Sequence, residues 1–153
     1  MADSLTARIA RIRSQTVGDI PRRSARRRPD KTAIIDGEVN LTFAELDEQV
    51  NRVAAALWDN GFRKGDRIAL LSHNCWQYAV LAFATARAGV VLVPINFMLG
   101  PDEIGYILDH SGVTGLIVED TLAAVASEAM ARDGHVDTKV VITAAGVPSP
   151  AGW

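Results

Sequence analysis

Residues 61–96 read GFRKGDRIALLSHNCWQYAVLAFATARAGVVLVPIN, and this stretch decides the fold. Its runs IALL and VVLV show no polar alternation, which is typical of parallel strands covered on both faces. Between them, Trp76 to Ala88 is apolar almost all round, which predicts a helix buried on more than one side. A glycine turn follows this helix, and Pro94 is expected to stop the second strand. Two strands joined in this way form a βαβ crossover, which is normally right-handed.

Before the crossover, the sequence predicts a helix and a hairpin. The helix is expected to begin near Thr16 or Asp19 and to end before Pro29, because a residue that precedes proline avoids the α conformation. Residues 32–36 and 39–41 flank a glycine, a pattern typical of two short strands joined by a turn.

The helix with the clearest sequence signal begins at Thr42. Thr42 and Glu45 have the spacing of a capping box, in which each side chain accepts a hydrogen bond from the other residue's backbone N–H. Apolar residues follow at helical spacing, and Trp58 falls within the same stripe, so its ring is expected in the core. Gly61 suits the left-handed position that ends a helix.

After the crossover, helices and strands continue to alternate. A helix is expected from Pro101 to Gly112, a buried strand over 115–118, a helix over 122–132 and a last strand over 139–143. Such alternation through the whole chain predicts the α/β class, with a mostly parallel, doubly wound sheet flanked by helices.

The sequence divides into three parts. Residues 1–15 resemble a short amphipathic N-terminal extension, residues 16–143 form the α/β unit, and residues 144–153 have the composition of a linker-like tail. At 153 residues the chain is long enough for one domain with a core. The single cysteine makes no internal disulfide, which fits a reducing cytoplasm, and no apolar run is long enough to predict a transmembrane helix.

Charge is unevenly distributed along the chain. Residues 1–31 carry nine basic and three acidic residues, whereas the remainder carries seven basic and fifteen acidic residues. A basic segment of this kind contacts nucleic acid, anionic lipid or an acidic partner, or it is solvated or docked on the acidic remainder. The last interpretation is preferred, because no aromatic residues or nucleic-acid motifs accompany the charge.

No catalytic constellation emerges from the residues alone. The phosphate-binding patterns G-x-G-x-x-G and G-x-x-x-x-G-K-[ST] are absent, and the glycines and bases of 61–65 precede a strand instead of following one. His73 and Cys75 suggest either a nucleophile pair or, preferably, a structural cysteine. His110 is expected at a helix end, and His135 with its neighbouring aspartates is only a weak metal pattern.

Four ordered motifs nevertheless resemble the N-terminal portion of the adenylate-forming superfamily, specifically the AMP-forming acyl-CoA synthetases or fatty-acid–CoA ligases. The stretches that carry the resemblance are LTFAEL (41–46), GFRKGDRIALLSHN (61–74), ARAGVVLVPIN (86–96) and LGPDEIGYILDHSG (99–112). Their order and spacing cover the chain from about Thr16 to Ile142.

The resemblance implies a parent enzyme that activates a carboxylic acid, expected to be a fatty acid, with ATP to an acyl-adenylate and transfers the acyl group to CoA. ATP, CoA and Mg²⁺ are implied for that parent, but the family motifs that handle ATP lie downstream of Trp153. No catalytic residue or metal ligand is therefore expected in this chain, and the chain alone is expected to be inactive. The alternative is a stand-alone, non-catalytic interaction or dimerisation module.

Two turns are expected to border the acyl and CoA cleft of the parent. Both follow the carboxyl ends of strands, where doubly wound sheets bind ligands. The candidate residues are His73, Asn74, Trp76, Asn96, Phe97 and Met98.

The expected partners are the rest of the synthetase chain and a fatty or other carboxylic acid, with no nucleic acid. A homodimer is a further expected assembly, because a missing partner sheet would leave apolar surface exposed. The expected location is the cytoplasm, with peripheral membrane contact as an additional option.

Overall fold

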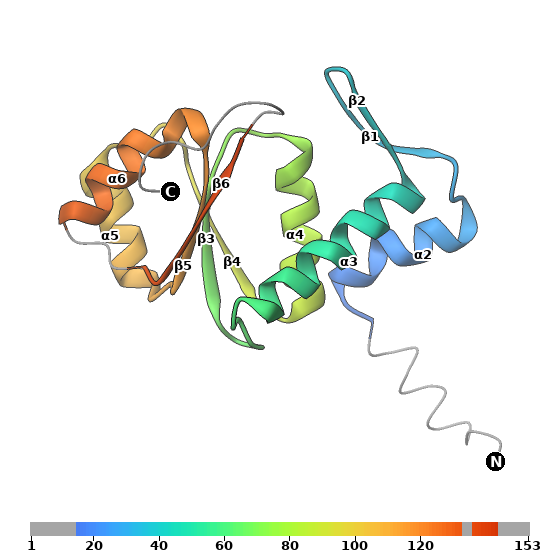
Figure 1. Cartoon of the computed structure of the whole chain (residues 1–153), viewed down its shortest axis with the longest axis horizontal. Coiled ribbons are helices and arrows are strands. Elements are labelled where there is room, and N and C mark those ends of the chain that lie inside the picture. The colour runs from blue at the N-terminus through green and yellow to red at the C-terminus, as the bar shows by residue number, and fades with distance from the viewer. Residues whose placement is uncertain (1–14, 133–135, 144–153) are drawn as a thin grey trace, which may run out of the picture.

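The computed structural model describes residues 15–132 and 136–143, so the expected helix in the first residues and the tail lie outside the described residues. A parallel sheet forms its centre, with strand order β4-β3-β5-β6. Helices cover both faces of this sheet (Figure 1). The strands are β3 (Arg67–Leu71), β4 (Val91–Ile95), β5 (Gly115–Glu119) and β6 (Thr138–Ile142).

The connections between strands make the sheet doubly wound. From β3 the chain passes through α4 (Trp76–Ala88) to β4, then crosses back through α5 (Pro101–Ser111) to β5 on the other side of β3. It continues through η2 (Asp120–Leu122) and α6 (Ala123–Arg132) to β6. The predicted α/β class and parallel topology are confirmed. The strand order reverses between β3 and β5, which makes their carboxyl ends the switch point where this class of sheet binds ligands.

The N-terminal part lies beside the sheet and contains the predicted helix and hairpin. A 3₁₀ turn η1 (Val17–Asp19) leads into α2 (Ile20–Arg27). The strands β1 (Thr32–Asp36) and β2 (Val39–Thr42) form a separate antiparallel hairpin before α3 (Phe43–Asp59). Helices α3 and α4 pack together on one face of the sheet, and α5 and α6 lie on the other (Figure 1).

The predicted helix ends are confirmed by their local geometry. At the start of α3, the Thr42 backbone N–H donates to Glu45 Oε2 at 2.8 Å, and the Glu45 N–H donates to Thr42 Oγ1 at 3.3 Å. The Thr42 hydroxyl also donates to Glu45 Oε2 at 2.8 Å, and these donations from the Thr42 backbone N–H and hydroxyl hold the pKa of the Glu45 carboxyl below its ordinary value. After α4, Gly89 adopts a φ of 77°, a left-handed conformation that favours glycine.

Two predictions about burial were wrong. Strand β4 is not covered on both faces, since Val91 and Pro94 are exposed, and it continues through Pro94 to Ile95. The reason is that β4 is an edge strand, where a proline costs no ladder hydrogen bond. Trp58 is 51% exposed instead of buried, and the guanidinium of Arg63 lies 5.2 Å from its ring centroid.

A half-buried arginine, Arg87, links the N-terminal turn to the helices that cover the sheet. The Arg87 guanidinium donates to the Gly18 carbonyl oxygen at 2.7 and 3.0 Å and to Asp47 Oδ1 at 2.7 Å. It thereby joins η1, α3 and α4. Gly18 is packed so closely on α4 that an added Cβ would lie 2.5 Å from the backbone nitrogen of Arg87.

No helix in the described ranges has both the length and the apolar character needed to cross a membrane.

Candidate functional site

The carboxyl ends of β3 and β5 meet at the switch point in a hydrogen-bonded cluster around Glu119. The Glu119 carboxylate accepts the backbone N–H of His73 at 2.8 Å and the hydroxyls of Ser72 and Thr121 at 3.1 and 2.9 Å. The Nδ1 atom of His73 lies 3.0 Å from the same carboxylate. We call Ser72, His73, Glu119 and Thr121 the switch-point cluster.

The cluster fixes the charge of Glu119. Burial acts to raise the pKa of this carboxyl, but the hydrogen bonds from His73, Thr121 and Ser72 outweigh it and hold the pKa below its ordinary value of 4.5. Glu119 is therefore ionised at neutral pH and can only accept hydrogen bonds. It follows that Nδ1 of His73 carries a proton, which leaves Nε2 as the ring nitrogen available to a ligand.

A second loop reaches the cluster from β4. The Phe97 ring packs on the His73 ring with centroids 4.1 Å apart and an interplanar angle of 39°. The turn that carries Phe97 is held by Asn96, whose Oδ1 accepts the backbone N–H of Met98 at 3.0 Å. Met98 itself is 79% exposed. The structure thus brings together both predicted turns, through His73 and Phe97.

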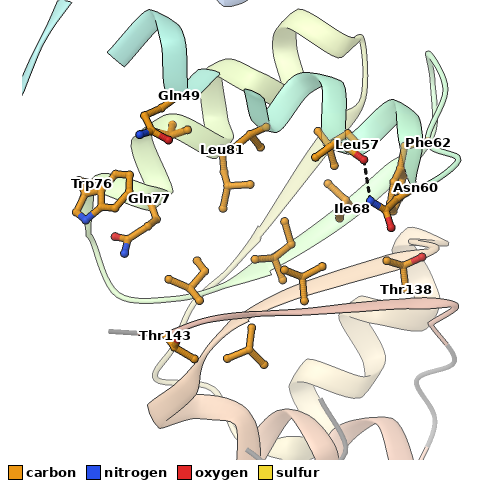
Figure 2. A pocket seen from close by; sticks show the side chains of 17 residues that line it. Gln49, Leu57, Asn60, Phe62, Ile68, Trp76, Gln77, Leu81, Thr138 and Thr143 are labelled. Carbon is orange, nitrogen blue, oxygen red and sulfur yellow. Dashed lines mark hydrogen bonds between the residues drawn. The ribbon is translucent and has the colours of Figure 1, made fainter. Parts of the chain in front are cut away.

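The two remaining sequence candidates lie differently. Asn74 is exposed in the turn after β3. Trp76 begins α4, and its backbone N–H donates to Asp36 Oδ2 of the hairpin at 2.9 Å. The indole is half-buried, packs against the core cluster that includes residues of α3 and α4, and lines an apolar groove (Figure 2).

Sequence reasoning missed Glu119 as a member of the site. In the sequence Glu119 stands beside Asp120, and the side chains of adjacent residues point apart at a strand end, so the pair itself does not indicate a shared site. Its position at the end of the buried run GLIVE was a usable signal, because charged residues at strand ends face the ligand-binding edge. The sequence does not show, however, that β5 lies next to β3.

The other chemical hypotheses from the sequence are not supported by the described residues. Cys75 is half-buried, with its Sγ 3.6 Å from Ser72 Oγ, and His73 is hydrogen-bonded to Glu119 instead of Cys75. The prediction for His110, by contrast, is confirmed: it lies in the last turn of α5, where its ring stacks on Tyr106 with centroids 5.3 Å apart. His135 lies outside the described residues. Within the described ranges, no three His, Cys, Asp or Glu side chains form a group that could hold a metal ion.

A second feature is an apolar groove on the face of the sheet that carries α3 and α4. These helices leave β6 partly uncovered, and a groove of about 460 Å³ opens between the helices and the strands (Figure 2). Leu57 and Leu81 form part of its helical wall, and Val140 on β6 is 45% exposed. This groove agrees with the expectation of exposed apolar surface.

Comparisons with known proteins agree with this architecture. The family model described as AMP-binding enzyme matches residues 21–152. A feruloyl-CoA synthase of Amycolatopsis sp. is 41% identical over 125 residues, which cover 79% of this chain and 26% of that protein. A medium/long-chain fatty-acid–CoA and 3-oxocholest-4-en-26-oate–CoA ligase of Mycobacterium tuberculosis is 32% identical, over 74% of this chain and 21% of that protein.

Solved structures give the same result. The N-terminal domain of FACL13 from Mycobacterium tuberculosis superimposes with a TM-score of 0.79 and 31% identity, covering 83% of this chain and 34% of that one. The chain spans about a quarter of the length of the relatives that it matches by sequence. The resemblance to the N-terminal portion of acyl-CoA synthetases is confirmed, and the chain belongs to the family of AMP-binding enzymes.

Proposed function

We propose that this chain is the N-terminal part of an acyl-CoA synthetase. The observation that carries the proposal is the family match over residues 21–152, together with sequence relatives that are all CoA ligases or synthases by name. The complete enzyme would join a carboxylic acid to AMP with release of pyrophosphate. The CoA thiol would then displace AMP to give the thioester.

Within that enzyme, the switch-point cluster and the loop of Phe97 are proposed to border the acyl and CoA cleft. His73 offers Nε2 as a polar contact, and Phe97 offers an apolar ring directly beside it. Glu119 holds the imidazole in one tautomer and orientation, the role of a carboxylate that positions a histidine. Asn74, Asn96 and Met98 remain candidates on the same two turns, whereas Trp76 is better explained by packing in the core.

At the switch-point cluster, ATP and Mg²⁺ find no matching donor set. The Glu119 carboxylate is occupied by donors from Ser72, His73 and Thr121. The described ranges also contain no metal-ligand group of three side chains. We therefore assign no step at ATP to this chain, and we propose that it is inactive without the remainder of the synthetase.

The apolar groove beside β6 supports the proposal that the remainder of the synthetase is the main partner. Exposed apolar grooves mark interaction surfaces or ligand-binding sites. The proposed location is the cytoplasm, with peripheral membrane contact as the finer hypothesis. A homodimer and the domain limits at residues 15/16 and 143/144 remain predictions.

The test is ATP–pyrophosphate exchange with a panel of aromatic and fatty carboxylic acids, on the chain alone and on the full-length polypeptide that contains it. Exchange is expected only with the full-length protein. His73→Ala in that protein is expected to lower kcat/KM about tenfold through loss of a cleft contact, whereas the control His110→Ala, which also removes an exposed imidazole stacked on an aromatic ring, is expected to change little.

Three outcomes would contradict parts of this proposal. Exchange by the chain alone would disprove its inactivity. Equal effects of the two histidine variants on kcat/KM would contradict the proposal that His73 lines the cleft. A full-length protein without exchange on any acid, together with a stable dimer of the chain alone, would favour the non-catalytic interaction module.

A further inference from the structure

A small pocket lined by positive charges lies where α2 turns into the hairpin and α3. Its volume is about 350 Å³, and its lining residues are Ser24, Arg27, Arg28, Lys31 and Phe43. In Figure 1, α2 and the first turn of α3 lie on the side of the molecule opposite α5 and α6. The pocket is therefore separate from the switch-point cluster, and no role in the proposed synthetase reaction accounts for it.

The backbone holds the three cations in place. The Arg28 N–H donates to the Ser24 carbonyl oxygen at 2.8 Å, which closes the end of α2. The Phe43 N–H donates to the Lys31 carbonyl oxygen at 2.9 Å, which ties the turn to the first residue of α3. Both contacts use main-chain atoms, and the exposed side chains of Arg28 and Lys31 line the pocket together with Arg27.

The positive charge of the pocket is not neutralised by the described part of the chain. Arg27 donates through Nε to the Arg23 carbonyl oxygen, which carries no formal charge. Among the described residues, no carboxylate lies within 4.0 Å of the charged groups of Arg27, Arg28 or Lys31. Asp30, the one acidic residue in this turn, is exposed and forms no such ion pair either. Three like charges at one pocket repel one another, and a bound anion removes that repulsion.

We propose that this pocket binds a phosphate group. Guanidinium groups match the geometry of phosphate oxygens through paired N–H donors, and an ammonium adds a compact positive charge. The Ser24 hydroxyl supplies a neutral donor at the same pocket, and the Phe43 ring forms an apolar wall beside it. The phosphate belongs either to a soluble phosphate ester or to a lipid headgroup, two sources with the same chemistry at the pocket.

The experiment follows backbone amide signals of the ¹⁵N-labelled chain during titration with sodium phosphate, at an ionic strength kept constant with sodium chloride. We expect saturable shifts confined to the end of α2 and the start of α3. Arg28→Gln is expected to weaken this binding about tenfold. The matched control is Arg26→Gln, which removes the same charge from the same exposed helix surface but outside the pocket, and it is expected to change the affinity less than twofold.

A second arm identifies the source of the phosphate. The two variants are compared for co-sedimentation with phosphatidylcholine vesicles, with and without phosphatidylglycerol. A larger loss for Arg28→Gln than for Arg26→Gln on the anionic vesicles assigns the pocket to a lipid headgroup, and a difference seen only with soluble phosphate assigns it to a soluble ester. Equal losses for both variants in both arms, or shifts that do not saturate, would show diffuse attraction to a basic surface and would overturn the proposal. None of these measurements depends on synthetase activity.

Discussion

At the scale of single residues, Glu119 organises the candidate site. One carboxylate joins the ends of two strands by accepting hydrogen bonds from the backbone of His73 and from hydroxyls on both sides. Such a carboxylate contributes more to the stability of the fold than a charge on the surface does, because it accepts hydrogen bonds from several donors at once in a partly buried position. Its removal should therefore affect stability as well as the orientation of the His73 ring.

Glu119→Gln is expected to lower the free energy of unfolding at pH 7 by about 1–2 kcal/mol, because the amide NH₂ replaces an acceptor that faces donors. The folded-state pKa of Glu119 is lowered, so its contribution is present above the ordinary value of 4.5 and is lost as pH falls through the folded pKa. The difference between wild type and variant should then shrink in acid. Urea unfolding at several pH values from 7 downward measures it.

The matched control is Glu48→Gln on α3. Glu48 pairs with Arg52 at 2.9 Å, but both side chains are more than half exposed, so the change should stay within about 0.5 kcal/mol. Because the other titrating carboxyls are common to all three proteins, they cancel in the differences. If Glu119→Gln lowered the free energy of unfolding equally at neutral and acidic pH, the stabilisation would not come from the ionised Glu119 carboxylate.

At the scale of elements, η1 packs directly on the backbone of α4 at a glycine. Gly18 lies against the backbone of α4, and its carbonyl oxygen accepts two hydrogen bonds from Arg87. The backbone of Gly18 is not in the left-handed region, so the requirement for glycine here comes from space alone.

Gly18→Ser is expected to destabilise the chain by about 1–3 kcal/mol, because its Cβ forces η1 away from α4 and strains the hydrogen bonds of Arg87. Gly100→Ser is the control. An added Cβ there meets nothing closer than 3.9 Å, and serine is a favourable residue at the N-cap of α5. Chemical unfolding of both variants provides the comparison. A loss of stability in Gly100→Ser as large as in Gly18→Ser would show that the close approach to α4 is not the cause.

At the scale of the whole molecule, the uncovered face of β6 is the main departure from a closed domain. The groove beside β6 leaves apolar side chains in contact with water, and Val140 is 45% exposed there. Surfaces of this kind favour association, because burying apolar area is worth about 25 cal/mol per Å².

The chain alone is therefore expected to self-associate with increasing concentration, and Val140→Lys is expected to weaken that association. Val91→Lys is the control, since Val91 has nearly the same exposure, 47%, on the opposite edge strand but does not line the groove. Sedimentation velocity over a range of concentrations measures both effects. A wild-type chain that stays monomeric, or equal effects of the two lysine variants, would contradict the role of the groove.

The sequence by itself determined the order of the elements and the ends of helices such as α3 and α4. Capping residues, glycines and apolar runs act over a few neighbouring positions, so the pattern 42–45 located the start of α3, and 76–88 located α4. The family motifs added the class of the parent enzyme. These signals are local, which is why they can be read along the chain.

Only the tertiary structure decided which strands are neighbours and which side chains are exposed. The order β4-β3-β5-β6 made β4 an edge, exposing Val91 and admitting Pro94, and it placed Glu119 beside His73 although the two residues lie 46 positions apart. It also left β6 uncovered. Contacts between distant segments depend on how the helices and the sheet pack in space. The apolar sequence pattern of a strand is the same whether the strand has one neighbour or two, so the pattern cannot distinguish an edge strand from a central one.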